Sequence, residues 1–197
     1  MKKQLVIGLA AALCATLPFT PAFAALKAGD TAPDFTANGS LGGSDFHFNL
    51  KTALKKGPVV VYFYPSAYTG GCDLEAHTFA EQSDKFAKAG ITIVGVSADD
   101  LGRLKQFSAD PQFCAGKFPI ASDADTKIAQ SYNLNVTPPR AGAKDVNQVD
   151  INHAFIERVT YVIGKDGKIL ATLSSKTDGL SPDQHVSKSL EIVSAAK

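Results

Sequence analysis

Cys72 has the clearest setting for chemistry in this sequence. It stands in the stretch YFYPSAYTGGCDLEAHTF, which begins at Tyr62, and two glycines precede it at the expected start of a helix. A thiol attacks only as its thiolate, and a pKa of about 8.5 leaves about a few per cent of a free thiol ionised at neutral pH. The unpaired N–H groups and positive dipole at the start of a helix favour negative charge, and Thr69 adds a hydroxyl group nearby. The spacing therefore predicts a cysteine nucleophile in an anion-stabilising pocket.

An alternation of strands and helices is expected to position this site. Residues 58–64 (PVVVYFY) form a continuous apolar run, which is typical of a strand buried on both faces. Apolar residues recur at helical spacing over 72–89, and Gly90 follows as a stop. The remaining expected elements are a strand over 91–98, a helix over 101–109, a short strand over 118–122 and a helix over 126–132. This alternation predicts parallel strands joined by right-handed helical crossovers.

The C-terminal part changes to antiparallel pairing. RVTYVIG, the turn KDGK and ILATL predict a hairpin, because Asp166 and Gly167 supply the positive-φ residues of a tight turn. A last helix is expected to start at Pro182.

The predicted fold class is α/β and thioredoxin-like, with a central mixed sheet flanked by helices. GDTAPDF at 29–35 and the alternating FHFNL at 46–50 are expected to add an N-terminal β-hairpin. Residues 137–152 are rich in Pro, Gly and Asn and predict a long loop. Residues 25–197 have a length that suits one domain with one core.

The N-terminal residues predict export. Lys2 and Lys3 precede an apolar run, and the small-residue signature Ala22-Phe23-Ala24 follows, so residues 1–24 are expected to be a secretory signal peptide. The expected location is the bacterial periplasm, with no membrane attachment after cleavage. Loss of the two lysines takes the formal net charge from +1 to −1, which gives no basic excess for nucleic acid and favours small molecules or proteins as partners.

Two cysteines remain after such cleavage, Cys72 and Cys114, in a compartment where disulfides persist. A structural disulfide is the ordinary use of such a pair, but a chain of this length does not need a cross-link to fold.

The four histidines show no metal-ligand spacing, so no metal or other cofactor is expected, and each is predicted to lie on the surface or in a loop. They are His47, His77, His153 and His185.

The residues around the thiol also carry a family resemblance. Pro65, Thr69 and Cys72 match the signature Pro-x-x-x-Thr/Ser-x-x-Cys, and the chain resembles the peroxiredoxins, most closely the bacterioferritin-comigratory type. The resemblance covers essentially all of residues 25–197. It implies a thiol-dependent peroxidase in which Cys72 is the peroxidatic nucleophile, attacks hydrogen peroxide or an organic hydroperoxide, and becomes a sulfenic acid.

The resemblance assigns a charge-stabilising role to an arginine. Arg158, at the start of RVTYVIG, would stabilise both the thiolate and the charge on the breaking O–O bond. Arg140 in TPPR is a competitor for this role. Glu75 is expected to be an ordinary acid in the first turn of a helix, or alternatively to support the arginine.

The resemblance also assigns the binding of the peroxide. The Thr69 hydroxyl and the N–H groups of Gly71 and Cys72 would orient the peroxide oxygens. Gly70 and Gly71 let the main chain approach the substrate closely, and Pro65 would keep water out.

A second thiol usually condenses with the sulfenic acid before it is over-oxidised. Cys114, in SADPQFCAGKFP, is the remaining candidate for this resolving role; some relatives place the resolving cysteine five residues after the peroxidatic one, where this chain has His77. The expected product is an intramolecular Cys72–Cys114 disulfide, reopened by a thioredoxin-like protein. The alternatives are a buried free thiol at Cys114 or a resolving thiol from another molecule. The expected assembly is a monomer or a weak homodimer.

Two other functions compete with this reading. An exported thioredoxin-like thiol-disulfide oxidoreductase would share the fold, but its Cys-x-x-Cys is absent because the fourth position is Glu75. A copper-binding module would need cysteines a few residues apart plus a histidine ligand, and Cys72 and Cys114 do not give that spacing.

Overall fold

The computed structural model describes residues 24–195 of the 197-residue chain. The predicted signal peptide, residues 1–24, lies outside the described residues except for Ala24. None of the helices in the described part combines the length and the apolar character that a membrane span requires.

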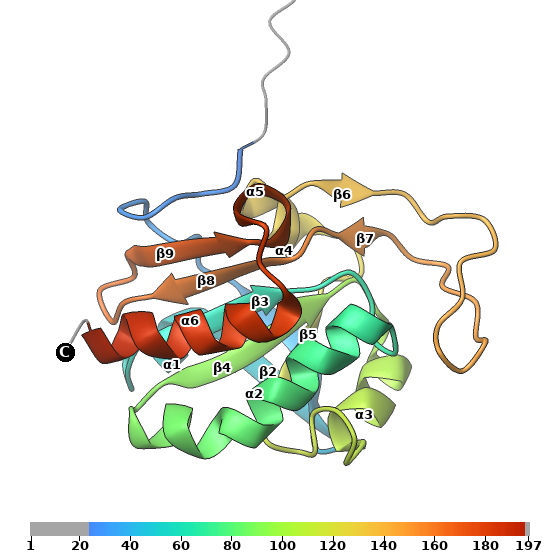
Figure 1. The fold of residues 1–197 in the computed structure, drawn as a ribbon, viewed down its shortest axis with the longest axis horizontal. Coiled ribbons are helices and arrows are strands. Elements are labelled where there is room, and N and C mark those ends of the chain that lie inside the picture. The colour runs from blue at the N-terminus through green and yellow to red at the C-terminus, as the bar shows by residue number, and fades with distance from the viewer. Residues whose placement is uncertain (1–23, 196–197) are drawn as a thin grey trace, which may run out of the picture.

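A seven-stranded mixed sheet forms the centre of the molecule, in the order β2-β1-β5-β4-β3-β8-β9 (Figure 1). β3 pairs in parallel with β4, and β4 with β5, whereas the other neighbouring strands are antiparallel. The predicted α/β class with a mixed central sheet is therefore confirmed. The strands of this sheet are β1 (Thr36–Leu41), β2 (Ser44–Asn49), β3 (Val59–Phe63), β4 (Thr92–Ser97), β5 (Ile120–Ser122), β8 (Val159–Ile163) and β9 (Ile169–Ser174).

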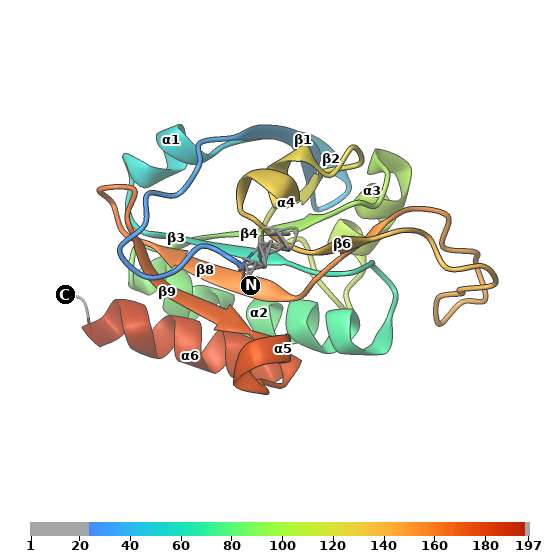
Figure 2. The same ribbon diagram turned by 90° about the horizontal axis from the view of Figure 1, so that it is seen from above.

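Helices cover both faces of the sheet, as Figure 2 shows. α2 and α6 pack side by side on one face, while α1 and α4 lie on the opposite face. The helices are α1 (Leu50–Leu54), α2 (Gly70–Lys88), α3 (Leu101–Ala109), α4 (Lys127–Ser131), α5 (Ser175–Asp178) and α6 (Pro182–Ala195).

Each face of the sheet has its own apolar core, and β3 contributes to both. Val59, Val61 and Phe63 pack into the core beneath α1 and α4, and the alternate residues Val60 and Tyr62 pack into the core beneath α2, α3 and α6. All five residues of β3 are buried. This two-sided burial is why the strand reads as an unbroken apolar run rather than as an alternating one.

The predicted elements are present, with three corrections. α2 begins at Gly70 rather than at Cys72, so Cys72 is the third residue of the helix. The N-terminal hairpin is formed by β1 and β2, and GDTAPDF precedes it instead of forming one of its strands. In the hairpin between β8 and β9, Gly167 has a positive φ of 80°, and Asp166 does not adopt a positive φ.

The loop predicted over residues 137–152 is long, as expected. It joins β6 (Val136–Thr137) to β7 (Phe155–Ile156), which pair with each other in a small second sheet. Figure 1 shows this loop projecting from the body of the molecule.

Candidate active site

Cys72 lies in the first turn of α2, where the chain leaves the end of β3. Its N–H donates to the carbonyl oxygen of Thr69 at 2.8 Å, and the N–H of Asp73 donates to the same oxygen at 2.9 Å. The Cys72 N–H is therefore already paired, and its predicted contact with a substrate would have to share or replace that bond. The Thr69 hydroxyl does not cap the helix but donates to the carbonyl oxygen of Ser66 at 2.8 Å.

The sheet brings Arg158 to this thiol. β8 pairs antiparallel with β3, and Val159 lies opposite Phe63, so Arg158 reaches the edge of the sheet from which the Cys72 segment emerges. Its Nη2 atom donates to Cys72 Sγ at 3.1 Å. A Cβ on Gly71 would lie 3.2 Å from the same Nη2, which explains why a glycine is suited to this position.

Arg158 also pairs with Glu75, one turn further along α2. Its Nη1 atom donates to Glu75 Oε2, and the Glu75 side chain is fully buried. Burial raises the pKa of Glu75 to about 7, although the neighbouring Arg158 charge opposes this rise. Of the two roles expected for Glu75, the structure shows the contact that supports the arginine.

Burial dominates the electrostatics of Cys72 itself. Only 2% of the residue is exposed, and this desolvation raises the pKa of its thiol, while the charge of Arg158 and the Thr69 hydroxyl lower it. The sequence suggested a helix start that would simply favour the thiolate. In the structure the burial of the thiol opposes its ionisation, so the Arg158 cation is the main group that promotes it.

Arg140, the predicted competitor of Arg158, lies elsewhere. It is exposed, and its guanidinium stacks over the ring of Phe155, with 4.7 Å from Cζ to the ring centroid. Pro65 is half-buried, directly after β3 and before the segment that leads to Cys72. The structure therefore places Arg158 in contact with Cys72 and Thr69 beside it, while Pro65 lies in the same segment between β3 and α2.

His185 extends this buried polar group and was not predicted. Its Nδ1 lies 2.9 Å from the Thr160 hydroxyl and 4.0 Å from Glu75 Oε1, and its Nε2 lies 2.9 Å from the Ser175 hydroxyl. Burial and the Arg158 charge lower the pKa of His185 to about 4, so the ring stays neutral. The prediction of a surface or loop position is wrong for this histidine. The available signal was helical spacing, since Ser189 and Val193 follow it at intervals of four and share its buried face.

Cys114 is buried in a turn that follows α3. Both it and Cys72 are free thiols, and both belong to the apolar core beneath α2 and α3. Burial raises the pKa of Cys114 well above its ordinary value, and Asp110 adds to this effect. His77 on α2 contacts the carbonyl oxygen of Gln112 at 3.0 Å and so links the helix to this turn.

Within residues 24–195, no group of three His, Cys, Asp or Glu side chains is arranged to hold a metal ion. The site contains instead a buried thiol, a cation in contact with it and a hydroxyl group nearby. Such a set can stabilise a thiolate and the negative charge that develops on a leaving oxygen.

Comparisons with known proteins are consistent with this chemistry. A model of the AhpC/TSA family matches residues 28–172. Peroxiredoxin Bcp of Escherichia coli K12 is 31% identical over 144 residues, which cover 73% of this chain and 83% of that protein. Chloroplastic peroxiredoxin Q of Oryza sativa subsp. japonica is 29% identical over 196 residues, which cover 92% of this chain and 80% of that protein.

Solved structures give the same result for the fold. Peroxidoxin BcpB from Mycobacterium tuberculosis superposes with a TM-score of 0.71 at 29% identity, over 87% of this chain and 99% of that one. The Xanthomonas campestris bacterioferritin comigratory protein superposes with a TM-score of 0.61 at 26% identity, over 81% of this chain and 90% of that one. These likenesses confirm the predicted thioredoxin-like fold.

Proposed function

This chain belongs to the AhpC/TSA family, as a thiol-dependent peroxidase of the bacterioferritin-comigratory type, and we propose that Cys72 is the nucleophile through which it reduces hydroperoxides. The observation that carries the proposal is the 3.1 Å contact between Arg158 Nη2 and Cys72 Sγ. In this contact a permanent cation faces a buried thiol, which favours the thiolate that the reaction requires.

The proposed reaction begins with attack of the Cys72 thiolate on the terminal oxygen of the hydroperoxide. A sulfur–oxygen bond forms while the O–O bond breaks, and the leaving alkoxide or hydroxide takes up a proton to become an alcohol or water. Arg158 stabilises the charge on the breaking bond, and the Thr69 hydroxyl and the Gly71 N–H orient the peroxide oxygens. Pro65 shields the thiol from water.

The proposed substrates are hydrogen peroxide and organic hydroperoxides. The X. campestris bacterioferritin comigratory protein has alkyl peroxide reduction activity, and it matches 81% of this chain. Cys72 itself belongs to the apolar core beneath α2.

The second proposed step joins the two thiols. The Cys114 thiol attacks the sulfenic sulfur of Cys72, a disulfide forms, and water leaves. A disulfide needs the two Cα atoms within about 7 Å. Cys72 lies in α2 and Cys114 in the turn after α3, and in the proposed step the start of α2 unwinds to bring the two sulfurs together. A thioredoxin-like protein then reduces the disulfide by exchange.

The proposed setting follows from the first residues of the chain. Lys2, Lys3 and Ala22-Phe23-Ala24 support a cleaved signal peptide over 1–24, a mature domain over 25–197 and action in the bacterial periplasm. The proposed active form is a monomer or a weak homodimer.

Mass spectrometry of the reduced protein after one equivalent of peroxide tests this function. We expect one added oxygen on the peptide that contains Cys72, followed by conversion to a Cys72–Cys114 cross-link. Oxidation that begins at Cys114, or that leaves both thiols unchanged while peroxide disappears, would contradict the assignment.

A further inference from the structure

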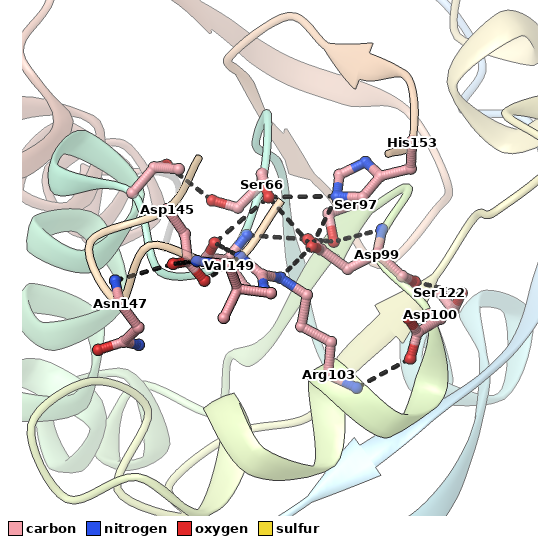
Figure 3. A network of polar contacts seen from close by, with 12 residues as sticks. Ser66, Ser97, Asp99, Asp100, Arg103, Ser122, Asp145, Asn147, Val149 and His153 are labelled. Carbon is pink, nitrogen blue, oxygen red and sulfur yellow. Dashed lines mark hydrogen bonds and ion pairs between the residues drawn. The ribbon is translucent and has the colours of Figure 1, made fainter. Parts of the chain in front are cut away.

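A buried polar network lies beside the segment that leads to Cys72 (Figure 3). Its centre is Asp99, just after β4, whose side chain is completely buried. Five groups surround the two carboxylate oxygens at 2.7 to 3.1 Å and compensate for the burial of this charge. They are the Ser66 hydroxyl, the Ala67 N–H, the Ser97 hydroxyl, His153 Nε2 and Arg103 Nε.

Arg103 connects Asp99 to a second buried carboxylate. From α3 its Nε lies 2.8 Å from Asp99, and its Nη2 lies 2.9 Å from Asp145 and donates to the Ala67 carbonyl oxygen at 2.7 Å. The guanidinium also lies over the Tyr68 ring, 5.3 Å from its centroid. Arg103 therefore contacts the segment before Cys72 at two places, the main-chain carbonyl group of Ala67 and the aromatic ring of Tyr68.

Asp145 brings the long 137–152 loop into this network. Its side chain is 1% exposed, and its Oδ1 accepts from the N–H groups of Asn147 and Val149 at 2.8 and 2.9 Å. The N–H of Val146 donates to the Tyr68 carbonyl oxygen at 2.9 Å. A loop that the sequence left without a role is thus fixed directly onto the segment that carries Thr69.

His153 completes the charge balance of the network. Its Nδ1 lies 2.8 Å from the Ala154 carbonyl oxygen and its Nε2 lies 2.8 Å from Asp99, so each ring nitrogen faces an acceptor and both must donate. Burial alone would lower the pKa of His153, but Asp99 raises it above its ordinary value. Two cations, His153 and Arg103, therefore face two carboxylates, Asp99 and Asp145.

The presence of Ser66, His153 and Asp99 together does not make a hydrolytic triad. In a triad the acid orients Nδ1 and the serine donates to a free Nε2. Here Nε2 contacts Asp99 and Ser66 at once, and Nδ1 faces a carbonyl oxygen. His153 has no free nitrogen with which to accept a proton, so the group serves to hold structure.

We propose that Arg103 and Asp145 are positioning residues for the peroxidase reaction: they hold residues 66–69 in the conformation that encloses Cys72, and their contacts open when α2 unwinds. The proposal rests on the proposed function. Thr69, the expected peroxide ligand, is tied to this segment because its hydroxyl donates to the Ser66 carbonyl oxygen. Tyr68 has a positive φ of 56°, a conformation that a non-glycine residue keeps only when its surroundings impose it.

The same segment also reaches the resolving thiol. The Tyr68 ring packs edge-on against Phe107 and Phe113, with centroids 5.0 and 5.5 Å apart, and Phe113 precedes Cys114. Movement of residues 66–69 therefore affects both cysteines. A weaker network should favour the unwound state, slow the reaction with peroxide and accelerate disulfide formation.

Asp145→Asn tests this directly, because it keeps the side-chain volume and removes the charge that faces Arg103. Rapid kinetics on the reduced protein give the rate constant for peroxide consumption and the rate constant for disulfide formation. We expect the first to fall and the second to rise, the second by about tenfold or more, the scale of one buried charge-assisted hydrogen bond. The matched control is Asp150→Asn in the same loop, since Asp150 is exposed and pairs only with Lys144 among the described ion pairs; it should leave both rate constants unchanged.

Opposite changes in the two rate constants distinguish positioning from a general loss of stability, which would lower both. Arg103→Lys retains the positive charge but not the several N–H donors of the guanidinium. It should likewise lower the rate constant for peroxide consumption and raise the rate constant for disulfide formation. Unchanged rate constants, or two that fall together, would overturn the proposal.

Amide exchange on the unaltered protein provides a test that needs no variant. In the oxidised form, the N–H groups of Ala67 and Val146 should lose protection together. A protected Val146 beside an exposed Ala67 would overturn the proposal. Absence of a Cys72–Cys114 disulfide would instead contradict the proposed function. Amide exchange of Ala67 and Val146 in the reduced Asp145→Asn protein would then test the positioning role. Faster exchange than in wild type would support that role, and unchanged exchange would overturn it.

Discussion

Arg158 donates from Nη2 to the Sγ of Cys72 across 3.1 Å, although 86 residues separate the two in the chain. The same guanidinium pairs through Nη1 with Glu75, whose side chain is completely buried. One cation thus serves two buried acidic groups and promotes the ionisation of each.

Replacing Arg158 with methionine should show how much the thiol depends on this cation. Burial already raises the pKa of Cys72, and without Arg158 less remains to oppose that effect, so the pKa should rise further. We expect the rate constant for reaction with peroxide to fall by about 10² or more, the scale for loss of a charge-stabilising group. Stopped-flow kinetics and a titration of thiolate absorbance measure the two quantities.

Arg140→Met is the matched control for that variant. It removes an exposed arginine that stacks on Phe155, and it should change neither the pKa of Cys72 nor the rate constant. A slow Arg140→Met protein beside an unchanged Arg158→Met protein would transfer the role to Arg140.

Glu75 should make the protein less stable as pH rises. Its pKa is raised from 4.5 to about 7 by burial, so between these values the folded protein holds the proton more tightly than the unfolded chain does. The free energy of unfolding falls with pH wherever the folded state holds more protons. Relative to wild type, Glu75→Gln should therefore gain stability from pH 4.5 to about 7 and then level off. Urea denaturation at several pH values measures this difference, and a constant difference would contradict the raised pKa.

His185 should have the opposite effect. Its pKa is lowered from 6.5 to about 4, so between these values the unfolded chain holds more protons and the free energy of unfolding rises with pH. His185→Gln removes this contribution and should be less sensitive to acid than wild type over that range. The same denaturation series tests it; a variant that loses stability on acidification as steeply as wild type would show that His185 is not held neutral.

The disulfide step should leave a signature of local unfolding. In the oxidised protein we expect faster amide exchange over residues 69–77, while β3 and β4 remain protected. Cys114→Ser should prevent the cross-link and trap sulfenic acid at Cys72, which a sulfenic-acid reagent detects. Equal exchange in both redox states, with the cross-link confirmed by mass, would mean that the two thiols meet without unwinding.

Much of the fold could be predicted because the local signals agree with the tertiary structure. The unbroken apolar run of β3 reflects burial on both faces, and α3 spans Leu101–Ala109 as its pattern indicates. The conformation of the turn between β8 and β9 was harder to predict. Of Asp166 and Gly167 only the glycine takes a positive φ, and the residue types of this pair do not show whether one or both will do so.

The site was only partly predictable because its contacts depend on register and burial. The motif placed Pro65, Thr69 and Cys72 near one another, but the contact with Arg158 depends on the pairing of Phe63 with Val159. The helical spacing of His185 with Ser189 and Val193 did carry a signal, whereas the burial of Asp145 comes from packing between distant segments, which no local pattern reveals. The same holds for the rise in the pKa of Cys72, because the desolvation that causes it exists only in the folded protein.

The central claim is that Cys72 performs the reaction with peroxide, and peroxide consumption by Cys72→Ser tests it most directly. Serine replaces sulfur with an oxygen that does not ionise usefully near neutral pH, so the variant should consume no peroxide above the background rate. Cys114→Ser, assayed beside it, should still consume the first equivalent because its peroxidatic thiol is intact. Substantial peroxide consumption by Cys72→Ser would contradict the account.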